Sequence, residues 1–137
     1  MECFRVLVVH RQEVMLEEVK SALLRREPYV RHFQCGFDGL QAAKLEEFDL
    51  ILSGTDLPLI TGFELIRSIR NLSKNSLTPV IFISDALSER HQSLNRQLKG
   101  LGIIGRSNLR ANLDFILDDS ANLDFSNTNP ITHPALN

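Results

Sequence analysis

Short apolar runs alternate along this chain with longer segments in which apolar residues recur every three or four positions. The run FRVLVV at residues 4–9 is apolar and β-branched, which is typical of a central strand covered on both faces. The segments between such runs have the spacing of amphipathic helices. The pattern predicts strands at residues 4–9, 29–34, 49–53, 79–84 and 103–104, and helices at residues 12–26, 37–47, 61–71, 88–99 and 108–117.

Strands that alternate with helices predict βαβ units with right-handed crossovers, and therefore a parallel sheet. Five such units predict a single α/β domain of the flavodoxin-like (βα)5 type, a doubly wound sheet with strand order 2-1-3-4-5. In such a sheet, ligands bind beyond the carboxyl ends of the strands. We expect this domain to span residues 1–118, followed by a polar tail at residues 119–137 with too few apolar residues to fold alone.

The composition, 43% hydrophobic and 23% charged, is that of an ordinary soluble globular protein. A net charge of −2 gives no reason to expect a nucleic-acid partner. No apolar run could span a bilayer and the N-terminus lacks the charge layout of a signal peptide, so we expect a cytoplasmic protein with no membrane partner. Cys3 and Cys35 are expected to be free thiols, because cytosolic cysteines are usually reduced.

The segment DLILSGTDLP at residues 49–58 runs from an apolar strand into a short loop, and Gly62-Phe63-Glu64 then opens a helix. With the spacing of the other strands, this arrangement resembles a response-regulator receiver domain over roughly residues 4–117. The family implies that the residue ending this strand is an aspartate that accepts a phosphoryl group. The corresponding residue here is Gly54, which has no side chain and cannot act as a nucleophile.

The resemblance also assigns the other functional positions. It implies two acids that bind Mg²⁺ after the first strand, where this chain has His10 and Arg11. Ser84 corresponds to the switch hydroxyl after the fourth strand, and Arg106 to the lysine after the fifth. We expect no metal and no cofactor, because two arginines beside the metal position would repel a divalent cation. The degenerate phosphorylation pocket therefore comprises His10, Arg11, Gly54, Asp56, Ser84, Asp85 and Arg106.

Three functions are compatible with these residues. The first is a phosphorylation-independent binding module of a two-component or phosphorelay system, read by a histidine kinase, an output protein or a second copy of the chain in a homodimer. The second is a small-anion sensor in which Arg11, Ser84 and Arg106 hold a phosphate or carboxylate. The third is an unorthodox phosphoacceptor at Asp56. The partner face of the binding module is expected either on the first helix or around the fourth helix, the fifth strand and the last helix. The candidate residues of the latter face are Glu89, Arg90, His91, Arg96, Lys99 and Ile103.

We expect no enzymatic activity, since the chain has no Gly-rich nucleotide fingerprint and no nucleophile–base pair. No DNA-binding element follows the last expected helix, so direct transcriptional output is not expected. An Arg11 paired with Asp56 or Asp85 would favour the binding module, whereas an unpaired, inward Arg11 would favour the anion sensor. We expect a trans Arg106–Ser107 peptide bond, because a cis bond before a residue other than proline costs about 3 kcal/mol.

Overall fold

The computed structural model describes residues 3–86 and 88–121. Five parallel strands form one sheet in the order β2-β1-β3-β4-β5, so the flavodoxin-like topology predicted from the sequence is confirmed. The strands are β1 (Arg5–Val9), β2 (Tyr29–Phe33), β3 (Leu50–Gly54), β4 (Val80–Ile83) and β5 (Gly102–Ile104). The helices are α1 (Val14–Ala22), α2 (Gly36–Leu45), α3 (Gly62–Leu72), α4 (Glu89–Gln97) and α5 (Leu109–Ala121), with short 3-10 turns at Leu24–Arg26 and Arg106–Asn108.

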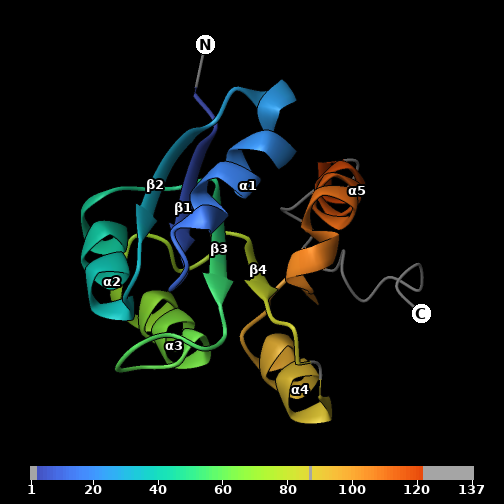
Figure 1. The fold of residues 1–137 in the computed structure, drawn as a ribbon. Helices are drawn as coiled ribbons and strands as arrows, with labels where there is room; N and C mark the ends of the chain where they lie inside the picture. The colour runs from blue at the N-terminus through green and yellow to red at the C-terminus, as the bar shows by residue number, and fades with distance from the viewer. Residues whose placement is uncertain (1–2, 87, 122–137) are drawn as a thin grey trace.

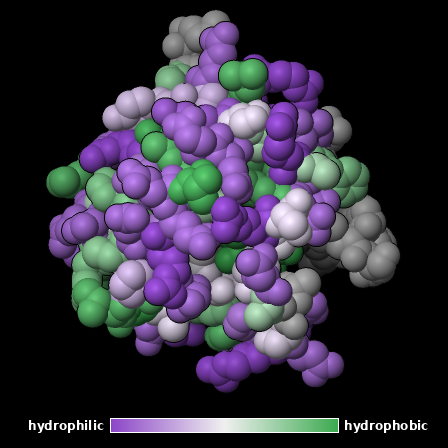
Figure 2. All heavy atoms as spheres, viewed as in Figure 1, coloured by the Kyte–Doolittle hydropathy of each residue, from purple (hydrophilic) through white to green (hydrophobic). Residues whose placement is uncertain are grey.

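The sheet is covered on both faces, which explains why its central strands are apolar without alternation. Residues of α1 and α5 pack on one face, and residues of α2, α3 and α4 pack on the other. In Figure 1 the arrows of β2, β3 and β4 all point downward, so their carboxyl ends meet at one edge of the molecule. The outer surface is largely hydrophilic in the view of Figure 2, with apolar side chains in small separate groups.

Two helices begin where their polar residues predict. The Thr61 hydroxyl accepts the Glu64 backbone N–H at 3.0 Å, and the Glu64 carboxylate accepts the Thr61 N–H at 2.8 Å, which together form a capping box at the start of α3. Ser88 caps α4 by accepting the His91 N–H at 3.1 Å. Despite this cap, α4 is weakly anchored, because none of its nine residues is buried.

The ends of the first and last helices differ most from the sequence-based expectation. The first helix ends at Ala22 rather than residue 26, and a 3-10 turn follows before Glu27 takes a left-handed conformation with φ of 47°. The last helix continues to Ala121, so the expected boundary at residue 118 falls inside it. The remainder of the expected tail lies outside the described residues. Cys3 and Cys35 are free, as expected.

No helix in the part of the chain that the structure describes has the length and apolar character needed to cross a membrane.

Candidate functional site

The carboxyl ends of β1, β3 and β4 and the segment after β5 bring the predicted site residues to one edge of the sheet. The parallel register places Val9 beside Ser53 and Gly54 beside Ile83. One step further, the Ser84 N–H donates to the Ile104 carbonyl at 2.9 Å. The residues that follow these strands therefore share one rim, as the topology predicted.

The imidazole of His10 lies against the α-carbon of Gly54. A Cβ atom on Gly54 would be 2.9 Å from His10 Cδ2 and 3.5 Å from Nε2. A distance below 3.0 Å is closer than such atoms can pack, so the ring occupies the space that a side chain at position 54 would enter.

Three hydrogen bonds hold His10 in this position. Its ring Nδ1 accepts the Gln12 N–H at 3.1 Å, its backbone N–H donates to the Phe33 carbonyl at 3.0 Å, and its carbonyl lies 3.1 Å from the His32 ring Nε2. Burial lowers the pKa of His10 below its usual value of 6.5, and the neighbouring Arg106 and His32 lower it further. The neutral ring is thus the favoured form, consistent with an unprotonated Nδ1.

The backbone of Gly54 also makes a close approach on its other side. Its carbonyl oxygen would lie 1.9 Å from a Cβ atom on Gly62, so only glycine fits at the first position of α3. The Gly62 N–H donates to the Thr55 carbonyl at 2.9 Å, and the Ser53 hydroxyl donates to the Gly54 carbonyl at 2.9 Å. These contacts fix the end of β3 against the start of α3.

Arg11 forms an ion pair with Asp56. The guanidinium donates to the carboxylate at 2.8 Å, and both side chains are exposed, Asp56 by 82%. Of the two arrangements considered for Arg11, the structure has the paired one.

Ser84 binds within its own loop. Its hydroxyl accepts the Ala86 N–H and donates to the Ala86 carbonyl, both at 3.1 Å, and the residue is only 7% exposed. The hydroxyl is therefore engaged in shaping the loop after β4.

Arg106 is directed toward α1. Its guanidinium donates to Gln12 Oε1 at 2.6 Å and lies 3.4 Å from Glu18 Oε2, while its backbone N–H donates to Asp85 Oδ1 at 3.0 Å. Arg11, Ser84 and Arg106 thus each bind a different partner instead of converging on one point. The Arg106–Ser107 bond is trans as expected, since no peptide bond among the described residues is cis.

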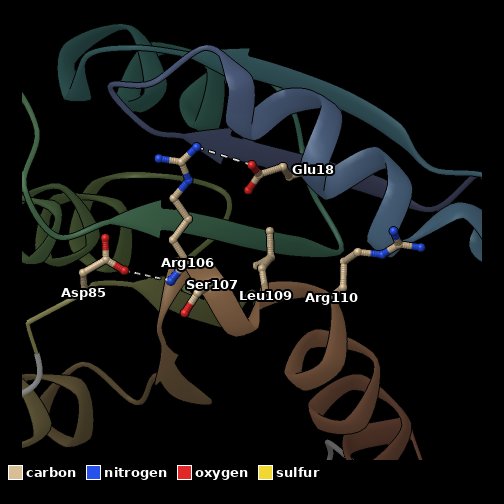
Figure 3. Close-up of a pocket in the computed structure, with 6 residues that line it drawn as sticks. All are labelled: Glu18, Asp85, Arg106, Ser107, Leu109 and Arg110. Atoms are coloured by element: carbon tan, nitrogen blue, oxygen red, sulfur yellow. Dashed lines mark hydrogen bonds and ion pairs between the residues drawn. The ribbon is translucent and has the colours of Figure 1, made fainter.

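A cavity of about 640 Å³ lies beside this site, between α1 and the start of α5. Figure 3 shows Arg106 crossing it toward Glu18, while Asp85 meets the Arg106 backbone at its margin. The cavity is distinct from the contact between His10 and Gly54, which lies at the ends of the central strands. Its lining residues are Glu18, Asp85, Arg106, Ser107, Leu109 and Arg110.

Comparison with known proteins agrees with this architecture. The profile of the response regulator receiver domain matches residues 6–104, which is more than half of the chain. The chain belongs to this family.

The curated relatives of this chain have low sequence identity to it. The receiver domain is 28% identical over 98 residues to the cell cycle response regulator CtrA of Brucella ovis, covering 72% of this chain and 39% of that protein. It is 28% identical over 81 residues to the probable transcriptional regulator ycf29 of Porphyra purpurea, covering 59% of this chain and 39% of that protein. The chain thus spans about two fifths of the length of these relatives.

Solved receiver structures share the fold. The chemotaxis protein CheY4 of Vibrio cholerae superposes with a TM-score of 0.73 at 22% identity, over 84% of this chain and 99% of that one. The signal receiver domain of an HD domain-containing protein from Pseudomonas fluorescens gives a TM-score of 0.75 at 18% identity, over 88% of this chain and 96% of that one. These similarities support the fold of this receiver domain.

The donor set at the strand ends does not fit the Mg²⁺ ion that the family implies. Mg²⁺ prefers carboxylate oxygens, but the two residues after β1 are an imidazole and a guanidinium, His10 and Arg11. Gly54 offers no side-chain ligand, and the Asp56 and Asp85 carboxylates bind Arg11 and the Arg106 N–H. Among the described residues, no group of three His, Cys, Asp or Glu side chains has a geometry that could hold a metal ion.

The residues expected to form a partner face of this receiver domain are not equally exposed. Glu89, Arg90, Arg96 and Lys99 are exposed, whereas Ile103 is half-buried against the apolar core. The His91 ring packs on Phe63 with a centroid separation of 5.1 Å, and its Nδ1 is buried without a partner among the described residues. The ring of His91 thus faces the protein interior, and the exposed part of the expected face consists of the other polar residues.

Two polar residues with structural roles, the buried Asn75 and the half-buried Arg70, escaped prediction. Asn75 is fully buried and binds four backbone or side-chain partners, including the carbonyls of Ala43 and Glu46 at 2.7 and 2.8 Å. Arg70 donates to backbone carbonyls alone, and burial lowers its pKa. A lone asparagine between Lys74 and Ser76 gives no signal in the sequence, but the spacing of basic residues along α3 could have drawn attention to Arg70.

Proposed function

We propose that this receiver domain is a phosphorylation-independent protein-binding module of a two-component system. The observation that carries this proposal is the position of the His10 ring over Gly54. The chain lacks an acceptor side chain at position 54, and the space into which that side chain would project is filled by the buried imidazole of His10. One hydrogen bond holds this ring, and two more hold the His10 backbone. This arrangement supports a binding role over a catalytic one.

The remaining acids near the site support the same proposal. The Asp56 carboxylate projects into solvent and is paired with Arg11. The Asp85 carboxylate accepts the Arg106 N–H at the start of the turn after β5. Attack on a phosphoryl donor by either acid would lack a divalent metal ion to neutralise the incoming phosphate, so we disfavour Asp56 as an alternative acceptor.

The anion-sensor alternative receives less support from the geometry. Arg11 and Arg106 would have to leave Asp56 and Glu18 before they could meet at an anion near Ser84. We therefore place recognition on the protein surface, where a histidine kinase, an output protein or a second copy of the chain would bind.

Incubation with acetyl phosphate and Mg²⁺, followed by intact mass spectrometry, tests the absence of phosphorylation. We expect an unchanged mass, while a conventional receiver domain in the same reaction gains one phosphoryl group. A phosphoryl gain by the present chain would overturn the proposal, and Asp56→Asn and Asp85→Asn variants would then locate the acceptor.

A Gly54→Asp variant serves as the matched control for the role of His10. We expect its mass to remain unchanged as well, because the new side chain meets the His10 ring and no metal ligands accompany it. Phosphorylation of Gly54→Asp alone would show that the imidazole does not close the site.

A further inference from the structure

One side of α3 carries two arginines, Arg67 and Arg70, which lie three residues apart. Phe63, four residues before Arg67, lies on the same side, and Lys74 follows in the turn after α3 ends at Leu72. At one end of this face Phe63 stacks on the ring of His91 in α4. This side of α3 therefore contacts α4 at Phe63.

Arg70 joins the other end of this face to the end of α4. Its guanidinium donates to the Leu98 carbonyl at 3.0 Å and to the Lys99 carbonyl at 3.5 Å. The same guanidinium donates to the Asn75, Ser76 and Thr78 carbonyls in the loop after α3. Arg70 thus binds the Lys99 carbonyl and the carbonyl of Asn75, which directly follows Lys74. We call Arg67, Arg70, Lys74 and Lys99 the basic stripe.

The members of the basic stripe lack acidic partners among the described residues, as do Arg90, Arg96 and Arg110, whereas the remaining arginines are paired. No member of the stripe forms an ion pair with any residue that the structure describes. Arg67, Lys74 and Lys99 are exposed. Elsewhere, carboxylates pair with Arg5, Arg11, Arg25, Arg26, Arg31 and Arg106.

This concentration of positive charge is unusual for a chain of net charge −2. Four like charges on neighbouring positions repel one another, and a nearby negative charge relieves that repulsion. Carboxylates of another molecule would supply it. Nucleic acid is the less suitable source of negative charge, because the chain as a whole has a pI of about 6.1 and would be repelled.

An exposed apolar side chain lies next to the basic stripe. Leu77 is 86% exposed, and it stands between Ser76 and Thr78, whose carbonyls both bind Arg70. A partner segment that combined carboxylates with an apolar side chain would meet both features. Contacts of this kind bury an apolar anchor while the charges set the orientation.

We propose that the basic stripe docks an acidic segment of a partner protein, with its carboxylates on Arg67, Lys74 and Lys99 and an apolar side chain on Leu77. This inference rests on the proposed binding function and names the chemistry of the partner. Arg70 acts as a positioning residue, since its guanidinium is already bound to backbone carbonyls.

The test uses a fluorescent peptide of Glu-Glu-Leu repeats and measures its binding to the full chain by fluorescence anisotropy. We expect saturable binding that weakens as salt is added, and no binding of a Lys-Lys-Leu peptide. Charge reversal in an Arg67→Glu, Lys74→Glu variant should raise the Kd roughly tenfold or more, since like charges across an interface are strongly unfavourable.

A Lys20→Glu, Lys44→Glu variant is the matched control, because both lysines are exposed, lie on α1 and α2, and form no ion pair with a described residue. It changes the net charge by the same amount and should alter the Kd by less than about twofold, because distant exposed charges are screened. If the reversal at positions 67 and 74 prevents folding, the Arg67→Gln, Lys74→Gln variant replaces it.

Three results would overturn the docking proposal: no binding of the acidic peptide, equal loss in both charge-reversal variants, or tighter binding of duplex DNA or phosphatidylserine vesicles to the stripe than of the peptide. The phosphorylation experiment separates this failure from that of the proposed function. An unchanged mass without peptide binding would reject only the docking of an acidic segment on the basic stripe. A gain of a phosphoryl group would reject the phosphorylation-independent function, whether or not the peptide binds.

Discussion

The imidazole of His10 and the α-carbon of Gly54 fit against each other so closely that a single added methyl group would bring Cβ to within 2.9 Å of the ring. Gly54 ends β3 and His10 directly follows the neighbouring strand β1, so the two residues are more than forty positions apart in the chain. Each therefore determines what the other position can hold.

A double-mutant cycle should reveal this coupling. We expect Gly54→Ala to lower the free energy of unfolding by about 1–3 kcal/mol, because it overpacks a buried contact. In a His10→Ala background the same change should cost about 1 kcal/mol less, as is usual for residues in contact. Urea unfolding measures the free energy of unfolding of the original chain, the two single variants and the double variant. Additive effects of the two changes would show that the ring does not occupy this space.

The stability contributed by His10 should depend on pH. Burial and the neighbouring Arg106 and His32 depress the pKa of His10 in the folded state below its usual 6.5, so the unfolded chain binds the extra proton first. The stabilisation by His10 is complete above about pH 6.5, and it falls as the pH drops toward the lowered pKa of His10 in the folded state. Nearby Asp85 and Glu18 oppose this effect only in part.

Comparing urea unfolding of the original chain and a His10→Asn variant from about pH 7.5 to pH 5 tests this dependence. The asparagine side chain can still accept the Gln12 N–H but does not titrate. We expect the loss of stability toward low pH to be smaller in the variant. Identical pH profiles would argue against a neutral, buried His10.

Replacing Arg70 should weaken the junction between α3 and α4. We expect Arg70→Ala to lower the free energy of unfolding by about 3 kcal/mol, because carbonyls of two segments lose a charged donor. Arg67→Ala, on an exposed neighbour of the same helix, should change it by less than about 0.5 kcal/mol. Chemical denaturation monitored by circular dichroism distinguishes the two variants, and similar losses in both would contradict the positioning role of Arg70.

Asn75 should be among the polar residues most sensitive to substitution. Its side chain accepts the Phe48 N–H at 2.8 Å and donates to two carbonyls at the end of α2, with no exposure to water. Asn75→Ala should cost about 2–4 kcal/mol, since it leaves buried backbone groups without partners. Thermal unfolding beside the exposed Asn71→Ala variant provides the comparison. A loss no larger than that of Asn71→Ala would mean that water replaces the amide.

The sequence was sufficient to predict the order of strands and helices because hydrophobic periodicity reflects burial directly. It also placed His10, Gly54, Ser84 and Arg106 at one edge, because that placement depends only on where parallel strands end. The sequence did not predict the directions in which these side chains point. That Arg106 turns toward Glu18 depends on packing between α1 and the segment after β5, which adjacent residues do not encode.

Helix ends were harder to predict for a related reason. The apolar spacing continues through residues 23–24, yet α1 ends at Ala22, where the chain tightens into a 3-10 turn before Pro28. The role of Arg70 was invisible because backbone carbonyls are present at every residue and leave no pattern. The basic spacing of Arg67, Arg70 and Lys74 was visible, but its meaning required the position of α4.

Gly54 and Gly62 show two different reasons for a residue to be glycine. A side chain at position 54 conflicts with another side chain, which substitution can shorten. A side chain at position 62 conflicts with the carbonyl of the main chain itself, 1.9 Å from where Cβ would be, and no substitution can remove that atom. In a saturation library built on a His10→Ala background, position 54 should therefore regain a range of tolerated residues, while position 62 stays restricted to one.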